Sequence, residues 1–195
     1  LKSPKEKIFD ASLWIFIASL FHFWCILFLF VIYVSIIFHV SRDYRNWLIP
    51  FIAVGAGAII FVLFSLIFDQ NWVEHLIKQT EMNFQWDYFV NNYKKIALTI
   101  FALFGIYFVF SMIFTVGNKP LVLQASYKKM IVSFFIGVMV FLFSPEKSNA
   151  ILVFTFLPLS VLSTNNIEYS QNKTYQEIVL FTVAIITISI YFFNL

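Results

Sequence analysis

The stretch ASLWIFIASLFHFWCILFLFVIYVSIIF, residues 11–38, decides the fold of this chain. It contains no Asp, Glu, Lys or Arg, and its only titratable groups are His22, Cys25 and Tyr33. A bilayer core of about 30 Å needs roughly 20 helical residues to cross it. These 28 residues are too many for one upright helix and few for two ordinary ones. The stretch therefore forms either one long tilted helix or a hairpin of two short helices that turns near His22.

The composition of the whole chain is that of a polytopic membrane protein. Of its 195 residues, 61% are apolar and 12% are charged, whereas a soluble domain is about 25% charged. The net charge of +3 is too small to indicate a nucleic-acid partner, and the single cysteine, Cys25, excludes an internal disulfide. We expect an all-α transmembrane bundle that forms one domain over residues 1–195. The polar start resembles no signal peptide and lacks Met, so we expect the C-terminal part of a longer chain.

Apolar runs predict about seven membrane segments. Two are the arms of the hairpin in residues 11–38, and the others are residues 48–68, 96–116, 130–143, 150–163 and 178–193. Residues 121–129 are expected to form a connector that ends in Lys128 and Lys129, and Pro158 is expected to kink its helix.

The longest polar segment, residues 69–95, is more than a linker. Its first apolar residues recur at helical spacing, which predicts an outward helix lying in the membrane interface over residues 73–78. The aromatic side chains around it predict a belt at headgroup depth. The belt residues are Trp72, Trp86, Tyr88 and Tyr93. In the preceding apolar run, Gly55 and Gly57 predict a small-residue surface for helix packing.

The distribution of Lys and Arg favours the hairpin, because positive charge concentrates on the cytoplasmic side of a membrane protein. A single crossing by residues 11–38 divides the 13 basic residues seven to six, whereas a hairpin divides them nine to four. The hairpin places both of its ends in the cytoplasm and residues 69–95 outside. These assignments predict a multi-pass protein of the bacterial inner membrane.

Several segments resemble a known family. The segments IFDASLWI (8–15), ASLFHFW (18–24), FSPEK (143–147) and FLPLS (156–160) are similar to an uncharacterised family of multi-spanning inner-membrane proteins of Bacteroidota. The resemblance covers nearly the whole chain and implies no activity.

The same features are more remotely similar to the later helices of membrane glycosyltransferases of the GT-C fold. Those enzymes carry a short-helix hairpin and a Phe-Ser, turn, Lys and Leu-Pro pattern like residues 143–158. The similarity implies an enzyme that acts on a polyprenyl-phosphate-linked sugar. Two departures put catalysis in doubt: His22 stands where such enzymes often place Lys, and their catalytic acid normally lies in an early outward loop that these residues do not match.

Candidate binding residues follow from position and charge. His22 is an ionisable group inside an apolar stretch, and Lys147 lies at an outward turn; both are candidates for binding a lipid phosphate. Four carboxylates of the polar segment are spread over 19 positions without metal-ligand spacing, namely Asp69, Glu74, Glu81 and Asp87. We therefore expect no metal and no cofactor, and we assign no catalytic residue.

Two hypotheses remain from the sequence. The first is a GT-C-like enzyme, or a degenerate relative, that uses a lipid-linked sugar. The second is a non-catalytic subunit packed within a larger membrane complex. Membrane lipid is a partner in both, and other membrane protein subunits are partners in the second.

Overall fold

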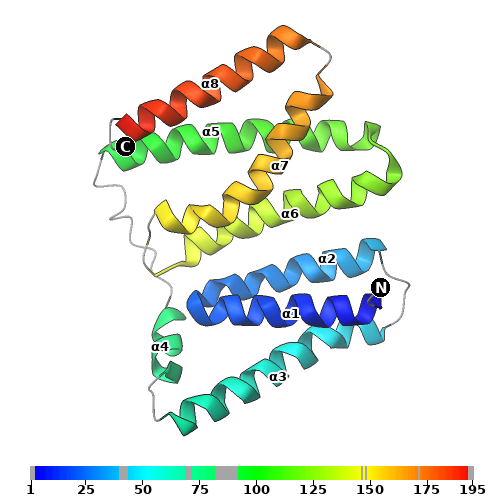
Figure 1. Ribbon diagram of the computed structural model, residues 1–195, viewed down its shortest axis with the longest axis vertical. Coiled ribbons are helices and arrows are strands. Elements are labelled where there is room, and N and C mark those ends of the chain that lie inside the picture. The colour runs from blue at the N-terminus through cyan, green and yellow to red at the C-terminus, as the bar shows by residue number, and fades with distance from the viewer. Residues whose placement is uncertain are drawn as a thin grey trace. The chain divides into compact units, whose positions relative to one another are not determined.

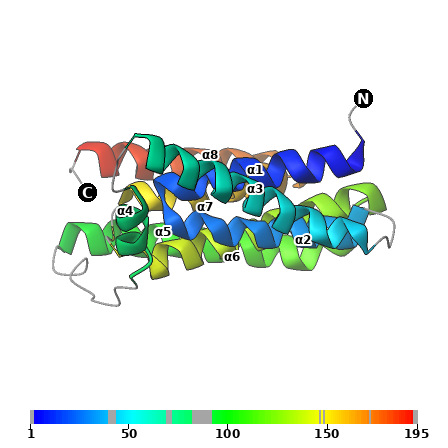
Figure 2. The same cartoon turned by 90° about the horizontal axis from the view of Figure 1, so that it is seen from below.

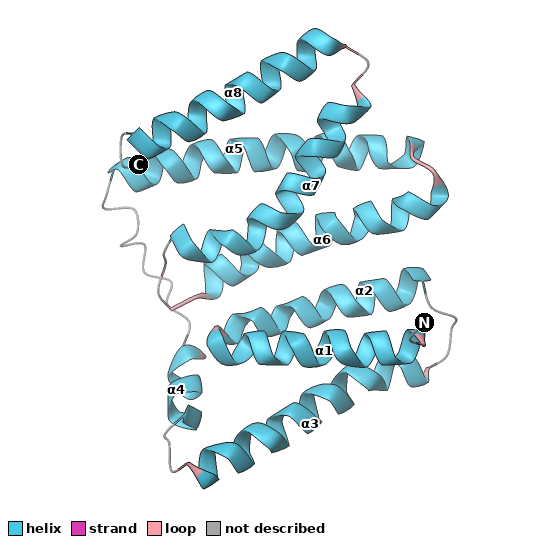
Figure 3. Cartoon of the chain, viewed as in Figure 1, coloured by secondary structure: helices cyan, strands magenta, loops and turns pink. Residues whose placement is uncertain are grey.

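A computed structural model of the protein describes residues 3–39, 44–68, 72–81, 92–145, 147, 149–170 and 172–192. Within these residues every regular element is helical (Figure 3). The α-helices are α1 (Pro4–Phe21), α2 (Leu29–His39), α3 (Arg45–Ile67), α4 (Trp72–Gln79), α5 (Asn92–Thr115), α6 (Leu121–Phe143), α7 (Val153–Tyr169) and α8 (Lys173–Phe192). The 3-10 helices are η1 (Phe23–Phe28), η3 (Val116–Asn118) and η4 (Asn149–Leu152).

The chain forms two compact units. Unit 1 comprises Leu1–Phe84 and Phe135–Lys147, and unit 2 comprises Gln85–Phe134 and Ser148–Leu195. Helix α6 contributes its last residues to unit 1 and its first residues to unit 2.

Unit 1 is built on the helical hairpin. Helix α1 starts where the Ser3 hydroxyl accepts the N–H of Glu6, with Pro4 at the first helical position. It ends at Phe21, and the backbone of the next residue, His22, is extended with φ −145° and ψ 103°. The chain then reverses through η1 into α2, which lies antiparallel beside α1 (Figure 1). The turn that the sequence predicts near His22 is therefore present.

Helices α3 and α4 complete the described part of unit 1. Helix α3 packs against α1 and α2. The indole of Trp72, at the start of α4, stacks near the rings of Phe61 and Phe64 on α3, with centroids 6.3 and 6.2 Å away. Figures 1 and 2 place α4 at the end of unit 1 where α1 and α3 end. The helix predicted over residues 73–78 is thus present, and its residues are largely exposed.

Unit 2 contains α5, the first part of α6, α7 and α8. Helix α7 packs along α5, and α8 folds back against α7 (Figure 1). Helices α5 and α6 approach closely at Gly105, where an added Cβ would lie 2.9 Å from Cζ of Phe134. Glycine permits this approach because it has no side chain.

Three of the described helices are long and apolar enough to cross a membrane, namely Arg45–Ile67, Lys95–Asn118 and Leu121–Phe143. The third corrects the expected division into a connector and a short arm, because residues 121–143 form one continuous helix of 23 residues. Lys128 and Lys129 do not break it: lysine is a good helix former, and its long stem lets the ammonium reach the interface. Helix α7 also runs past the expected end at Ser163 to Tyr169.

Candidate functional site

The two residues expected to bind a lipid phosphate lie in unit 1. His22 is half-buried at the hairpin turn, where its carbonyl accepts the N–H of Cys25 at 2.9 Å. Lys147 is also half-buried, and residues 146 and 148 beside it lie outside the described residues. The carbonyl of His22 thus helps to form the tight turn of the hairpin.

Helix α4 is bound to the hairpin turn by a glutamine that the sequence did not single out. The N–H of Phe23 donates to Oε1 of Gln79 at 3.1 Å, and Nε2 of Gln79 lies 3.1 Å from Nε2 of His75. Phe23 is the first residue of η1, and the first backbone N–H groups of a helix have no acceptor within that helix. Gln79 therefore supplies a missing partner at the turn.

Of the four residues in the expected aromatic belt, the structure describes the side chain of one, Trp72. Trp72 packs on α3, Trp86 and Tyr88 lie outside the described residues, and the side chain of Tyr93 in α5 is likewise outside them. The belt as a whole therefore stays a prediction.

The two glycines of α3 have different surroundings. An added Cβ at Gly57 would lie 2.5 Å from Cδ1 of Phe16 on α1, whereas Gly55 has nothing within 4 Å. Residues two positions apart point to opposite sides of a helix. The two glycines therefore do not share one packing surface: Gly57 is used within the chain, and Gly55 is open.

The described residues contain no group of three potential metal ligands among His, Cys, Asp and Glu. Of the four carboxylates noted in the sequence, Glu74 and Glu81 are exposed, and Asp69 and Asp87 lie outside the described residues.

Unit 2 holds a polar cluster that joins three helices at one end. Tyr175 of α8 donates its hydroxyl proton to Oδ1 of Asn166 on α7 at 3.0 Å. Nδ2 of Asn166 donates to the hydroxyl of Ser111 on α5. The hydroxyl oxygens of Tyr107 and Tyr175 are 2.5 Å apart, and because the single proton of Tyr175 is already used, Tyr107 is the donor. These bonds fix the α7–α8 connection against α5.

A lysine is held beside this cluster by aromatic rings. Nζ of Lys119, between α5 and α6, lies 3.6 Å from the ring centroid of Tyr169 and 5.9 Å from that of Tyr127. Burial lowers the pKa of Lys119, and the nearby Glu168 carboxylate partly raises it. The rings and the carboxylate thus replace part of the water that an exposed ammonium would have.

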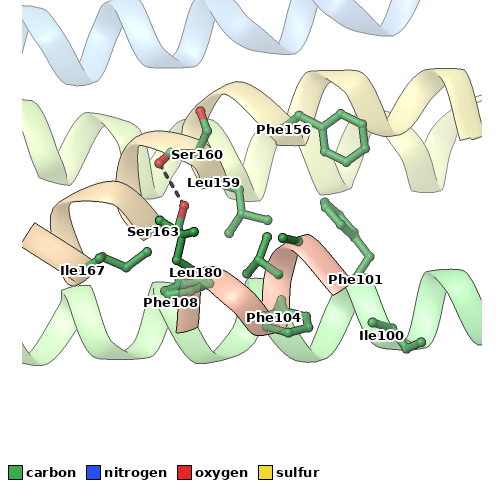
Figure 4. A pocket seen from close by; sticks show the side chains of 12 residues that line it. Ile100, Phe101, Phe104, Phe108, Phe156, Leu159, Ser160, Ser163, Ile167 and Leu180 are labelled. Atoms are coloured by element: carbon green, nitrogen blue, oxygen red, sulfur yellow. Dashed lines mark hydrogen bonds between the residues drawn. The ribbon is translucent and has the colours of Figure 1, made fainter. Parts of the chain in front are cut away.

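An apolar groove with a volume of about 700 Å³ lies between α5, α7 and α8 of unit 2 (Figure 4). We call it the apolar groove. Its lining residues are Ile100, Phe101, Phe104, Phe108, Phe156, Leu159, Ser160, Ser163, Ile167, Leu180, Val183 and Ala184. The two serines turn their hydroxyls to the backbone of α7: Ser160 donates to the carbonyl of Leu157 at 2.8 Å, and Ser163 to the carbonyl of Ser160 at 2.9 Å. The wall therefore has little hydrogen-bonding capacity left for an occupant.

A second, smaller cavity of about 290 Å³ lies between α6 and α7. We call it the polar pocket. It is lined by Tyr127, Ser160, Val161, Thr164, Asn165 and Glu168. Nδ2 of Asn165 donates to the hydroxyl of Tyr127, while Oδ1 of Asn165 is buried without a hydrogen-bond partner among the described residues.

The sequence pattern predicts neither cavity as a site. Their residues come from separate helices, so no local spacing brings them together. The only signal at this end of α7 is the pair Asn165 and Asn166 close behind an apolar run, since amides there need partners from another helix.

The family to which the chain belongs has no assigned activity. The model of a family of unknown function, DUF6427, matches residues 1–195. The chain is a member of this family. No curated protein and no solved structure matches it, so its function must be argued from its own geometry.

Proposed function

We propose that this DUF6427 protein is a multi-pass protein of the bacterial inner membrane that holds an apolar lipid chain in the apolar groove. The observation that carries the proposal is the groove itself: about 700 Å³ of space with an apolar wall, whose two serine hydroxyls are already bonded within α7. Such a wall suits a hydrocarbon chain, which has no hydrogen bonds to satisfy.

The position of the groove along α5 supports an occupant from the bilayer. The groove is lined on α5 by residues between Ile100 and Phe108, well inside the candidate span Lys95–Asn118. A groove at that depth opens to hydrocarbon rather than to water. An empty groove would lose contacts on both of its walls, and lipid chains are the available molecules that can fill it.

The size of the groove favours a chain over a partner helix. A helix about 10 Å across that rises 1.5 Å per residue occupies roughly 120 Å³ per residue, so the groove holds about six residues of one. A membrane-spanning partner needs about 20. A flexible alkyl or isoprenoid chain is narrower and can follow the groove.

The proposed topology has seven membrane segments. They are the two arms of the hairpin, α3, α5, α6, α7 and α8, with α4 lying at the outer interface. Two observations support it: α1 and α2 are antiparallel neighbours, and the nine-to-four division of basic residues requires both ends of the hairpin on one side.

The proposal concerns binding and leaves catalysis out. A polyprenyl phosphate, which the similarity to GT-C glycosyltransferases implies, is one lipid with a suitable chain. Lys147 belongs to unit 1 and the apolar groove to unit 2, and Lys147 has no role in the proposed binding of the chain. A non-catalytic subunit of a membrane complex that carries a bound lipid satisfies the same geometry.

The proposal can be tested with a photoactivatable phospholipid that carries a diazirine in its acyl chain. The full chain is placed in phosphatidylcholine nanodiscs with this lipid, irradiated, and the adducts are mapped by mass spectrometry. We expect adducts to concentrate on groove residues such as Phe104 and Phe156. Ala184→Phe should fill the groove and lower these adducts several-fold, because a phenyl ring occupies space that the chain would need.

Thr182→Phe is the matched control, since Thr182 lies on the same helix but does not line the groove. It should leave the adduct pattern unchanged. The proposal would be refuted if groove residues and exposed residues such as Leu103 were labelled equally, both in the original chain and in Ala184→Phe. A co-purifying polypeptide cross-linked to the groove residues would also refute it, because it would identify a protein as the occupant.

A further inference from the structure

The apolar groove is elongated, and its two ends differ. Along α5 its lining runs from Ile100 to Phe108, and along α7 from Phe156 to Ile167. Figure 4 shows Phe108 and Ile167 towards the left of the view and Ile100 and Phe156 towards the right. At 1.5 Å per helical residue, the lining is about 12 Å long on α5 and about 16 Å long on α7. The groove is therefore long enough to give an occupant a direction.

The polar cluster described above lies at the Phe108 end of the groove. Its members come from the three helices that line the groove, and they are Tyr107 and Ser111 of α5, Asn166 of α7 and Tyr175 of α8. Tyr107 and Asn166 directly precede the last lining residues of α5 and α7. The Tyr175 hydroxyl meets both of them, at 2.5 and 3.0 Å. The phenol of Tyr175 therefore reaches across to α5 and α7 where the apolar lining stops.

An apolar chain cannot advance through the polar cluster without displacing this phenol. Its displacement would break the hydrogen bonds of Tyr175 to Tyr107 and Asn166. Hydrocarbon offers no replacement for these bonds, and a polar group left unpaired away from water costs free energy. The hydrogen bonds thus hold the Tyr175 ring in place, and the ring marks the point beyond which a chain does not reach.

The other end of the groove lies nearer an accessible cation. Lys95 is exposed near the start of α5, five residues before Ile100. At the opposite end, Lys119 is buried among aromatic rings. Lys173 is exposed but precedes Tyr175 on α8, so the polar cluster lies between it and the groove. A headgroup phosphate at Lys95 can therefore meet an ammonium while its chain enters the groove from the end without the polar cluster.

The distance between Lys95 and the polar cluster matches the length of one acyl chain. Lys95 and Phe108 are thirteen residues apart on α5, which is about 20 Å along the helix. A hydrocarbon core of about 30 Å contains two leaflets, so one acyl chain spans about 15 Å of it. The glycerol that links the chain to its phosphate takes up the difference. A polyprenyl chain of many isoprene units is longer than this distance, and its surplus would lie outside the groove.

We propose that the apolar groove binds one acyl chain of a phospholipid from the leaflet at the start of α5, and that Tyr175 limits the length of this chain. The terminal methyl lies at Phe108 and Ile167, and the headgroup phosphate lies at Lys95. This inference rests on the proposed function, because it requires a lipid chain in the apolar groove. It adds the class of the lipid, the direction of its chain and the residue that selects the chain length.

The length limit can be tested with phosphatidylcholine probes that carry a diazirine at the end of a lauroyl, palmitoyl or behenoyl chain. Each probe is a minor component of dioleoylphosphatidylcholine nanodiscs that contain the full chain, so the bilayer thickness stays the same. We expect the lauroyl end to label Phe104 and the palmitoyl end to label Phe108 and Ile167. The behenoyl end should give several-fold fewer groove adducts, because it cannot pass the polar cluster and lies outside the groove.

Two variants of Tyr175 test the residue that sets the limit. Tyr175→Ala opens the end of the groove, so behenoyl adducts should rise several-fold and extend to Ser111. Tyr175→Phe is the matched control, because it loses the same two hydrogen bonds but keeps a ring of nearly the same size. Its behenoyl adducts should stay low. Equal behenoyl labelling of the original chain and both variants would overturn the length limit, and a rise in Tyr175→Phe would overturn the role of the ring.

The direction of the chain is tested with a palmitoyl probe whose diazirine lies next to the carboxyl group. This probe should label Ile100 and Phe101. Lys95→Gln should lower these adducts several-fold, and Lys173→Gln should leave them unchanged. Labelling of Phe108 in place of Ile100 would overturn the direction. In each of these failures the palmitoyl probes still label the groove, and the proposed function stands; absence of groove adducts from every probe would refute the proposed function and this inference together.

Discussion

The contact between Gly57 of α3 and Phe16 of α1 gives a quantitative test of the packing in unit 1. In Gly57→Ala, the new Cβ would lie 2.5 Å from Cδ1, 2.9 Å from Cε1 and 3.2 Å from Cγ of the Phe16 ring. Real Cβ atoms essentially never show the two shorter distances, and the third is tighter than nine in ten real contacts. Rotation of the ring about its own axis moves Cδ1 and Cε1 but leaves Cγ in place, so the ring must also shift by a few tenths of an ångström.

The magnitude follows from the space around the ring. Adding a methylene to a packed core typically costs about 1–3 kcal/mol. Phe16 and Gly57 both line a cavity of about 590 Å³ between α1, α3 and α4, into which the ring can swing, so we expect the lower part of this range, about 1–2 kcal/mol. Replacing glycine by alanine inside a helix returns up to about 1 kcal/mol. Gly57→Ala alone could therefore show a small net change.

Gly55→Ala separates the two contributions, because Gly55 lies on the same helix with nothing within 4 Å. It gains the helix propensity without a clash. We expect the free energy of unfolding of Gly57→Ala to lie about 1–2 kcal/mol below that of Gly55→Ala. The measurement is reversible unfolding by sodium dodecyl sulfate in mixed micelles, followed by tryptophan fluorescence.

A rescue variant completes the design. Phe16→Leu in the Gly57→Ala background removes the ring and should recover part of the difference between the two alanine variants. If Gly57→Ala proves as stable as Gly55→Ala, then α1 and α3 do not pack as described, and the reasoning fails.

Two further predictions concern the hairpin. Gln79→Leu removes the acceptor of the Phe23 N–H, so hydrogen exchange of that amide should accelerate about tenfold. Thr80→Ala is the control and should leave this exchange unchanged, because the Thr80 hydroxyl donates to the carbonyl of Ile77. Equal exchange in the original chain and in both variants would show that the bond between Phe23 and Gln79 is not made. Cysteines introduced at Lys5 and Arg42 should both react with a membrane-impermeant maleimide from the cytoplasmic side only, and labelling from opposite sides would rule out the hairpin topology.

The sequence predicted those parts of the fold that depend on local pattern. The break at His22 follows from the length of the apolar stretch and from the charges on either side of it. The helix Trp72–Gln79 follows from apolar residues at helical spacing. Both depend on residues close together in the chain, which is the range over which periodicity carries information.

The errors and omissions have physical reasons as well. The sequence pattern predicts a connector at Lys128 and Lys129, because charged residues are typical of the boundary of an apolar run, but a lysine can remain in a helix and extend its ammonium to the interface. Tyr107 and Tyr175 are 68 positions apart, and their bond arises only when α8 folds back along α7. The polar pocket likewise combines Tyr127 of α6 with Asn165 and Glu168 of α7. Nothing in a single sequence pairs such positions.

Many hydroxyl groups in this protein bond to a carbonyl of their own helix. Ser12 and Ser19 are buried in α1, and they donate to the carbonyls of Ile8 and Phe16, each at 2.7 Å. Such a bond is complete before any two helices meet, and it survives when they separate within the bilayer. A helix can thus enter the hydrocarbon with these hydroxyls already satisfied, and they then place no constraint on the order in which the helices associate. The choice of neighbour is left to shape, as at Gly57 and Gly105, and to the few amides and phenols that reach across.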